Sequence, residues 1–413
     1  MKRTLPLIGL AIVLLLLILP PIFGSRYTVL MVAQVLVAAS FAMSYNMLLG
    51  HTGLLSFGHA VYFGAGVFTA LYMTNGIGSG GLPLPLELVP LGAGLGGLIA
   101  ALVLGPVSVK SGQIAFAMIT LGIAELVAVA AMVFPSAFGG EQGISTDRMV
   151  DLTLTGLNYG RAENLYWLIL VWACLAIAAM AYLTRTPLGR LANAVRDNQE
   201  RVVFLGYSPF RIRYMQFCLS GAFAGVAGGL FALLFEISNS DIFGLRTSAD
   251  VLIATYLGGT SFVFGPVLGA ALVTLLESNL SRYTEAWLSY YGLLFVVIVL
   301  FAPKGIWSLF AAIPATIRRN GLGPTLLRGA YWFLMLLPGC LGGILVIEMS
   351  NHHANAFDPT EPLMLAGLPF DIFSAANWLL ALALLAISAG MLWQTKRRQA
   401  ARQIQAMTQE AHS

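Results

Sequence analysis

The stretch RTPLGRLANAVRDNQERVVFLGYSPFRIR, residues 185–213, is a polar loop between two strongly apolar segments. It carries six arginines but only two acids, Asp197 and Glu200. Arginine and lysine concentrate in the cytoplasmic loops of membrane proteins. The pattern therefore predicts a cytoplasmic loop between membrane-spanning helices, and we call residues 185–213 the arginine loop.

The rest of the chain has the composition of a membrane protein. Of its 413 residues, 58% are hydrophobic and 10% are charged, whereas roughly a quarter of a soluble domain is charged. A helix needs about 20 mostly apolar residues to cross a bilayer. Such segments lie near 5–23, 27–50, 55–74, 84–108, 112–135, 164–184, 214–237, 264–280, 285–302, 330–348 and 376–394, with a short one near 249–262. We therefore expect an all-α, polytopic integral membrane protein with about 10–12 transmembrane helices.

The positive residues also predict the orientation of these helices. Lysine and arginine occur at 2–3, at 110, in the arginine loop, at 304–328 and in the tail 396–402, and the intervening loops are poor in them. This alternation places both termini of a multi-pass inner-membrane protein in the cytoplasm. It requires 249–262 and 264–280 to form a short pair that turns at Gly258 and Gly259. Since no basic run contains interleaved aromatics, we expect no nucleic-acid partner.

The arginine loop contains an amphipathic segment of its own. Thr186 followed by Pro187 is a typical helix start, and Gly206 can end a helix. At 100° per residue, one face carries Leu188, Leu191, Val195, Val202 and Leu205, and the other carries Arg190, Asn193, Arg196, Asp197, Glu200 and Arg201. The pattern predicts one helix over 187–206. A protein partner could hold its polar face, or anionic membrane lipid could hold the helix at the interface.

Two glycine-rich clusters with polar residues interrupt the apolar pattern. They are GHTGLLSFGH at 50–59 and LGGTSF at 257–262. Irregular backbone at membrane depth is tolerated where it lines a cavity or packs against protein. The pathway candidates in these clusters are Gly50, His51, Thr52, Ser56, His59, Thr260 and Ser261. Ser56-Phe57 aligns with Ser261-Phe262, which indicates a possible internal repeat of the kind common in transporters.

Glu125 is a further pathway candidate, because it is the only acid near the middle of a long predicted span. A charge at that depth is costly and is usually functional or paired. The carboxylate could face the pathway or a subunit interface, or it could form a buried hydrogen bond to a neighbouring helix. His51 and His59 have no Cys, Asp or Glu close by in sequence, so we expect no metal site there.

Several motifs, in order, resemble those of one transporter family. GHTGLLSFGHAVYFGAG at 50–66 resembles the signature of the branched-chain amino-acid ABC importer permeases of the LivH/LivM type. Further stretches resemble the same family: ITLGIAEL at 119–126, FGGEQGI at 138–144, the segment 186–233, GGTSFVFGPVLGAA at 258–271 and LFAPKGIW at 300–307. The resemblance covers about residues 25–310 and is closer to the LivM half.

The resemblance implies three regions. Residues 1–24 form a first transmembrane span, 25–310 the permease core with its cytoplasmic coupling loop, and 311–413 an extension with two spans and a basic cytoplasmic tail. In such permeases the helix matching 187–206 docks on an ATPase. The residues expected to couple to the ATPase are Arg190, Arg196, Asp197, Asn198, Glu200, Arg201 and Gly206.

The implied partners are two ABC ATPase subunits, a second permease subunit (LivH type, or a second copy in a homodimer) and a periplasmic substrate-binding protein. A P-loop needs Gly-Lys before Ser or Thr, and no lysine of this chain follows a glycine. We therefore expect a transport subunit that is not an enzyme and binds no cofactor, with ATP used by the partner ATPases.

Other functions remain open at this point. Branched-chain amino acids are the usual substrates of the family, but relatives carry urea, short amides or other small organic solutes. An ion-coupled secondary transporter would need ionisable relays within the membrane, and Glu87, Glu236, Asp250 and Glu277 lie towards the ends of predicted spans. A membrane enzyme would need a clustered polar site, and no such motif is present.

Overall fold

The computed structural model describes residues 25–308, 321–355, 363–365, 368–371 and 373–410. Its helices are α2 Arg26–Thr52, α3 Ala60–Gly78, η1 Leu86–Leu88, α4 Val89–Ser108, α5 Gln113–Val133, α6 Pro135–Phe138, α7 Ala162–Leu183, α8 Pro187–Asp197, α9 Gln199–Phe204, α10 Pro209–Phe235, η2 Ser240–Phe243, α11 Leu245–Gly258, α12 Gly265–Leu280, α13 Trp287–Phe301, α15 Leu322–Asn355 and α16 Ala375–Glu410. The short strands β1 Ile144–Ser145 and β2 Ile237–Ser238 pair antiparallel, as do β3 Leu363–Leu365 and β4 Leu368–Phe370. The all-α prediction is confirmed.

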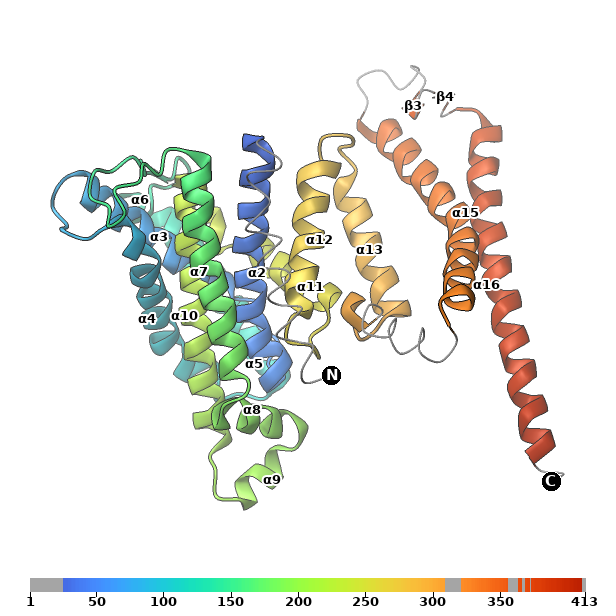
Figure 1. Ribbon diagram of the computed structural model, residues 1–413, viewed down its shortest axis with the longest axis horizontal. Coiled ribbons are helices and arrows are strands. Elements are labelled where there is room, and N and C mark those ends of the chain that lie inside the picture. Colours follow the sequence, from blue (N-terminus) through green and yellow to red (C-terminus); the bar gives the residue numbers. More distant parts are fainter. Residues whose placement is uncertain (1–24, 309–320, 356–362, 366–367, 372, 411–413) are drawn as a thin grey trace. The chain divides into compact units, whose positions relative to one another are not determined.

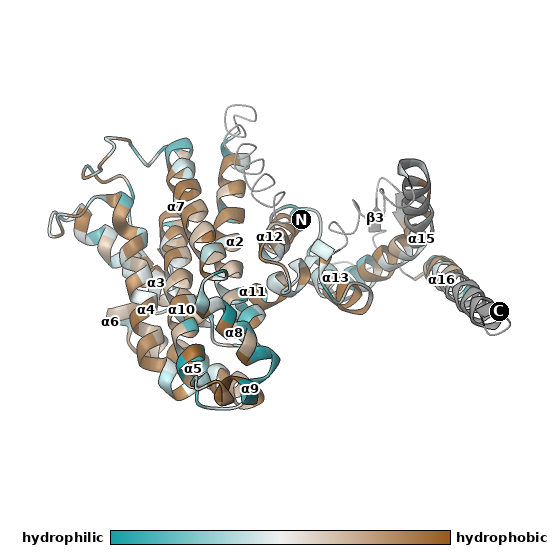
Figure 2. Ribbon diagram, turned by 60° about the horizontal axis from the view of Figure 1, so that its bottom comes forward, coloured by the Kyte–Doolittle hydropathy of each residue, from teal (hydrophilic) through white to brown (hydrophobic). Residues whose placement is uncertain are grey.

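Five helices are long and apolar enough to cross a membrane: Arg26–Thr52, Leu86–Ser108, Ile114–Val133, Ala162–Leu183 and Pro209–Phe235. Three shorter apolar helices span Gly265–Leu280, Trp287–Leu300 and Ala375–Met391. Hydrophobic residues, brown in Figure 2, predominate along the ribbons of α4, α7 and α10. The prediction of a polytopic membrane protein is therefore confirmed. The count of about 10–12 transmembrane helices remains a prediction, and the first of them, near 5–23, lies outside the described residues.

The chain divides into two units. The first comprises Met1–Ser278 and Val297–Ser308, and the second Asn279–Val296 and Leu309–Ser413. Within the first unit, α10 lies at the centre and packs against α2, α3 and α4 (Figure 1). Glycines permit these close contacts, since a Cβ on Gly225 of α10 would lie 2.5 Å from the carbonyl oxygen of Ala93 on α4. Small residues let membrane helices approach backbone to backbone in this way.

The predicted short pair is present as α11 and α12. Gly259 follows α11 with φ +108°, a value that favours glycine, and α12 begins at Gly265. A Cβ on Gly259 would also collide with the carbonyl oxygen of Lys304, so this turn packs against the segment after α13. The prediction of a turn at Gly258 and Gly259 is therefore confirmed, whereas a double crossing of the membrane by the two helices remains a prediction.

The loop between α6 and α7 is held down by two charged side chains. Arg148, only 6% exposed, donates to the carbonyl oxygens of Tyr159 and Leu233 at 3.0 Å each and forms an ion pair with Glu236 at 3.1 Å. Glu87 accepts hydrogen bonds from the backbone NH groups of Leu154 and Thr155. The segment 139–161 is thus an ordered cover on the first unit, at the opposite end from α8 and α9 (Figure 1).

The second unit contains a helical hairpin of α15 and α16, connected through β3 and β4. Ser388 of α16 donates to the carbonyl oxygen of Met335 on α15 at 3.1 Å. Tyr290 of α13 donates to Glu348 of α15 at 2.7 Å. The helix α16 continues through the basic tail at 396–402.

Candidate functional site

The arginine loop folds as two helices, so the prediction of one helix over 187–206 is wrong. The first helix begins at Pro187 after Thr186, as predicted, and the backbone of Gly206 has φ +84° just beyond the second. Asn198 interrupts the helix with an extended backbone, φ −158°, and its Oδ1 accepts from the NH of Arg201 at 2.9 Å. Asparagine favours such caps because its side chain replaces a helical hydrogen bond.

The break changes which side chains are buried. Val195 and Val202 remain buried and pack with Ala192 and Ile212. Leu205, predicted on the same apolar face, is 67% exposed because α9 starts a new helical phase after Asn198. The seven residues expected to couple to an ATPase are all exposed: Arg190, Arg196, Asp197, Asn198, Glu200, Arg201 and Gly206.

Sequence reasoning missed an apolar knob at the end of α9. Phe204 is 89% exposed, and Val203, Leu205 and Tyr207 beside it are at least half exposed. We call Val203–Tyr207 the apolar knob. Large exposed apolar side chains that lie together on one surface typically mark a binding site. The signal in the sequence was Asn198, because a cap there turns residues 203–205 away from the buried face.

The first helix of the arginine loop contacts the end of α2. Asn193 Oδ1 and His51 Nδ1 are 3.1 Å apart. Arg196 donates from Nη1 to the carbonyl oxygen of Gly50. The last carbonyls of a helix have no partner within the helix, so a cation there satisfies them. Two pathway candidates, Gly50 and His51, therefore lie directly under the arginine loop.

The turn between α11 and α12 reaches the same place. A Cβ on Gly50 would lie 2.7 Å from the carbonyl oxygen of Thr260, so only glycine allows this approach. Ser261, the next residue, is exposed. The glycine-rich clusters at 50–59 and 257–262 thus meet at Gly50 and Thr260, although about 200 residues separate them.

The remaining candidates of the first cluster lie in the interior. His59 is 1% exposed, its Nε2 lies 3.2 Å from Ser44 Oγ, and aromatic rings of Phe41, Tyr45 and Tyr62 surround it. Ser56 accepts from Tyr45 OH through its carbonyl at 2.9 Å. Thr52 bonds to the carbonyl of Leu48 in its own helix. Among the described residues, no group of three or more His, Cys, Asp or Glu side chains could hold a metal ion.

Glu125 lies apart from these residues, on the exposed face of α5. Ile114, Met118, Leu126 and Val129 are exposed on the same helix. This position does not fit the alternative of a buried hydrogen bond within the chain. The Glu125 carboxylate therefore lies on an apolar face of α5. That face must adjoin lipid, a second subunit or the pathway.

Comparisons with known proteins agree with one another. The family model described as branched-chain amino acid transport system / permease component matches residues 27–303. The permease protein LivM of the high-affinity branched-chain amino acid transport system of Salmonella typhimurium is 29% identical over 311 residues, which cover 69% of this chain and 71% of that protein. A probable LivM of Methanocaldococcus jannaschii is 24% identical, covering 64% and 88%. The Escherichia coli LivH is 23% identical, covering 65% and 90%. No solved structure gives a significant match.

Proposed function

Because the chain belongs to the family of branched-chain amino acid transport system permease components, we propose that it forms the translocation pathway of an ABC importer for branched-chain amino acids. Its proposed partners in that assembly are two ATPase subunits, a second permease subunit of the LivH type or a second copy, and a periplasmic binding protein. The assembly lies in the inner membrane with both termini of this chain in the cytoplasm. The ATPase subunits bind and hydrolyse the ATP.

The observation that carries this proposal is the exposed surface of α8 and α9. The exposed arginines Arg196 and Arg201 lie on the same two helices as the apolar knob, whose Phe204 is 89% exposed. Aromatic and arginine side chains dominate the binding energy of protein interfaces. A lipid-bound helix would instead turn its apolar face to the bilayer, whereas the apolar face of α8 is buried against Ile212 of α10.

The contacts of α8 offer a route from the ATPase to the membrane helices. When an ATPase bound to the apolar knob changes conformation, it moves α8 and α9. Arg196 and Asn193 transmit that movement to Gly50 and His51 at the end of α2. The contact of Gly50 with Thr260 extends it to the turn between α11 and α12. Alternation between inward- and outward-open states then follows from movement of these helices.

The test is a purified complex in vesicles, with Phe204→Ala as the variant. Truncation of an aromatic anchor at an interface costs about 2 kcal/mol, so ATPase binding should weaken about 30-fold and ATP-driven leucine uptake should fall with it. The matched control is Tyr283→Ala, because Tyr283 is 87% exposed and lies far from the arginine loop in sequence.

Parent-like ATPase binding by Phe204→Ala would contradict the docking surface. Leucine uptake by this chain alone, driven by a proton or sodium gradient, would show that the chain is a secondary transporter and not an importer subunit. ATP-driven uptake of urea or a short amide, with none of leucine, would keep the importer and change its substrate.

A further inference from the structure

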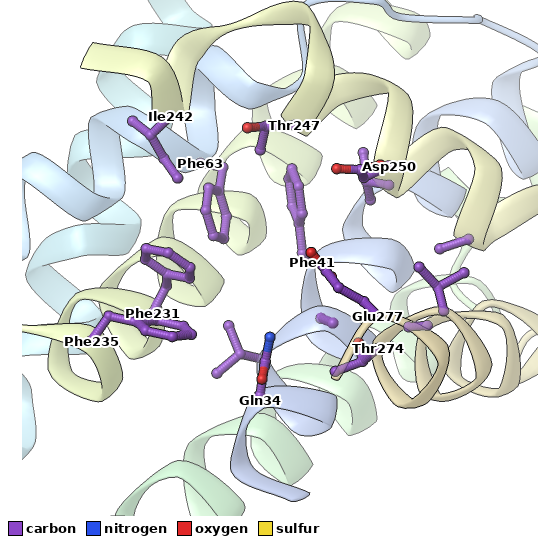
Figure 3. A pocket seen from close by; sticks show the side chains of 16 residues that line it. Gln34, Phe41, Phe63, Phe231, Phe235, Ile242, Thr247, Asp250, Thr274 and Glu277 are labelled. Atoms are coloured by element: carbon purple, nitrogen blue, oxygen red, sulfur yellow. The ribbon is translucent and has the colours of Figure 1, made fainter. Parts of the chain in front are cut away.

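A cavity of about 390 Å³ lies in the first unit, away from the arginine loop. Residues of α2, α3, α10, η2, α11 and α12 line it (Figure 3). Gln34 of its wall lies roughly 27 Å along α2 from Thr52, at about 1.5 Å per residue. The volume falls within the roughly 300–1,000 Å³ of small-molecule sites.

One wall of the cavity is aromatic. The ring centroids of Phe41 and Phe63 are 4.2 Å apart, those of Phe63 and Phe231 5.5 Å, and those of Phe231 and Phe235 4.5 Å. The four rings form a continuous apolar surface from three helices. Such a surface accommodates a branched aliphatic group, and its ring faces attract a cation.

Two carboxylates face this wall. Asp250 of α11 and Glu277 of α12 both line the cavity and are close enough to interact electrostatically. Arg246, one turn before Asp250, is exposed and offsets part of the charge of Asp250. The described lining includes no Lys, Arg or His. A positive group in the cavity would lie beside both carboxylates in a low-dielectric setting, where opposite charges attract strongly.

Neutral polar groups complete the lining. Gln34, Thr247 and Thr274 lie around the two acids, as Figure 3 shows. Their amide and hydroxyl groups can donate hydrogen bonds to an anionic oxygen. The cavity thus presents, side by side, acceptors for an ammonium group, donors for a carboxylate and an apolar wall.

We propose that this cavity binds a primary ammonium compound with a small apolar side chain, with its ammonium group at Asp250 and Glu277 and its side chain against the four phenylalanines. The inference rests on the proposed import function, because a branched-chain amino acid belongs to this class. The cavity is then a solute-binding station within the permease itself, separate from the binding protein.

The experiment measures binding of radiolabelled leucine to the membrane complex in nanodiscs of phosphatidylglycerol, without binding protein. In the Asp250→Asn/Glu277→Gln double variant, leucine should bind at least tenfold more weakly. The turnover rate of ATP-driven uptake should fall, with an unchanged KM for the loaded binding protein. The control variant is Glu163→Gln, an exposed acid at the start of α7 that does not line the cavity, and it should behave as the parent.

Competitors separate the chemical groups. Isopentylamine should displace leucine, whereas 4-methyl-2-oxopentanoate, which has the same skeleton but no amine, should compete at least tenfold more weakly. Phe231→Leu should weaken leucine binding without changing the charge, and it provides the test if the double variant fails to assemble.

Parent-like leucine binding and uptake in the double variant would overturn the inference, as would equal competition by the oxo acid. Loss of leucine binding when phosphatidylethanolamine is added would show that a lipid amine occupies the cavity and would also overturn it. If the parent complex binds isopentylamine but does not import leucine with ATP, the proposed function fails while the cavity assignment stands.

Discussion

Substitution of Arg148 by Met should release the cover formed by residues 139–161. The Arg148 guanidinium is almost fully buried, donates to the carbonyls of Tyr159, Leu233 and Leu234, and pairs with Glu236. Methionine retains the apolar stem and removes every one of these side-chain contacts, leaving the partly exposed Glu236 carboxylate and three carbonyls without their cation. Breaking a buried pair costs about 3–5 kcal/mol, and we take the lower end of this range because only the arginine of this pair is buried.

The lower figure of about 3 kcal/mol corresponds to a roughly 100-fold increase in the open population of this loop. When opening is fast compared with cleavage, the rate of proteolysis follows that population. Thermolysin digestion of the complex in nanodiscs should therefore cut the segment 139–161 about 100-fold faster in Arg148→Met than in the parent.

Arg161→Met is the matched control, because Arg161 lies at the end of the same loop and is exposed. It should be cut at the parent rate. Cleavage of Arg148→Met within threefold of the parent would refute the reasoning, since the buried guanidinium would then contribute little to holding the loop.

Three further predictions concern other parts of the chain. Glu125→Gln should leave expression near the parent level and lower uptake, because an exposed carboxylate on α5 serves no packing role; parent-like uptake by this variant, with no accumulation of Glu125→Leu, would make the residue structural. Truncation after Arg319 should retain measurable ATP-driven uptake, because the family match ends at residue 303; complete loss of assembly would show that the extension belongs to the core. Gly225→Ala should lower the thermal midpoint of the complex, because its Cβ would lie 2.5 Å from the Ala93 carbonyl oxygen, whereas Gly122→Ala, with nothing within 4 Å, should not; equal midpoints would contradict the packing argument.

Properties that depend on local sequence could be predicted. The apolar segments indicated an all-α membrane protein because span length and hydropathy are set by the bilayer. Thr186 with Pro187 correctly marked the start of α8, and Gly258 with Gly259 marked the turn before α12. In each case the signal was a backbone requirement that few other residues meet.

Contacts between distant segments could not be predicted. The side chains of His51 and Asn193 lie 3.1 Å apart across 142 positions of the sequence. The sequence placed Asp250 and Glu277 separately, each near the end of a predicted span. In the structure they line the same cavity, because α12 folds back against α11. The apolar knob was missed because Asn198 fits a helical pattern as well as it fits a cap, and tertiary packing decides between the two.

The glycine contacts at the centre of the first unit have a mechanical consequence. Where backbones of α3, α4 and α10 touch at Gly66, Gly97 and Gly225, no side chains lie between them that could change rotamer and let one helix slide. We therefore expect these three helices to move as one body in the proposed transport cycle. The displacement that opens and closes a passage would then fall to helices outside this body, among them α2, α11 and α12. Glu125 on α5, Asp250 on α11 and Glu277 on α12 also lie outside this body, so a displacement of those helices would change the distance of each acid from it.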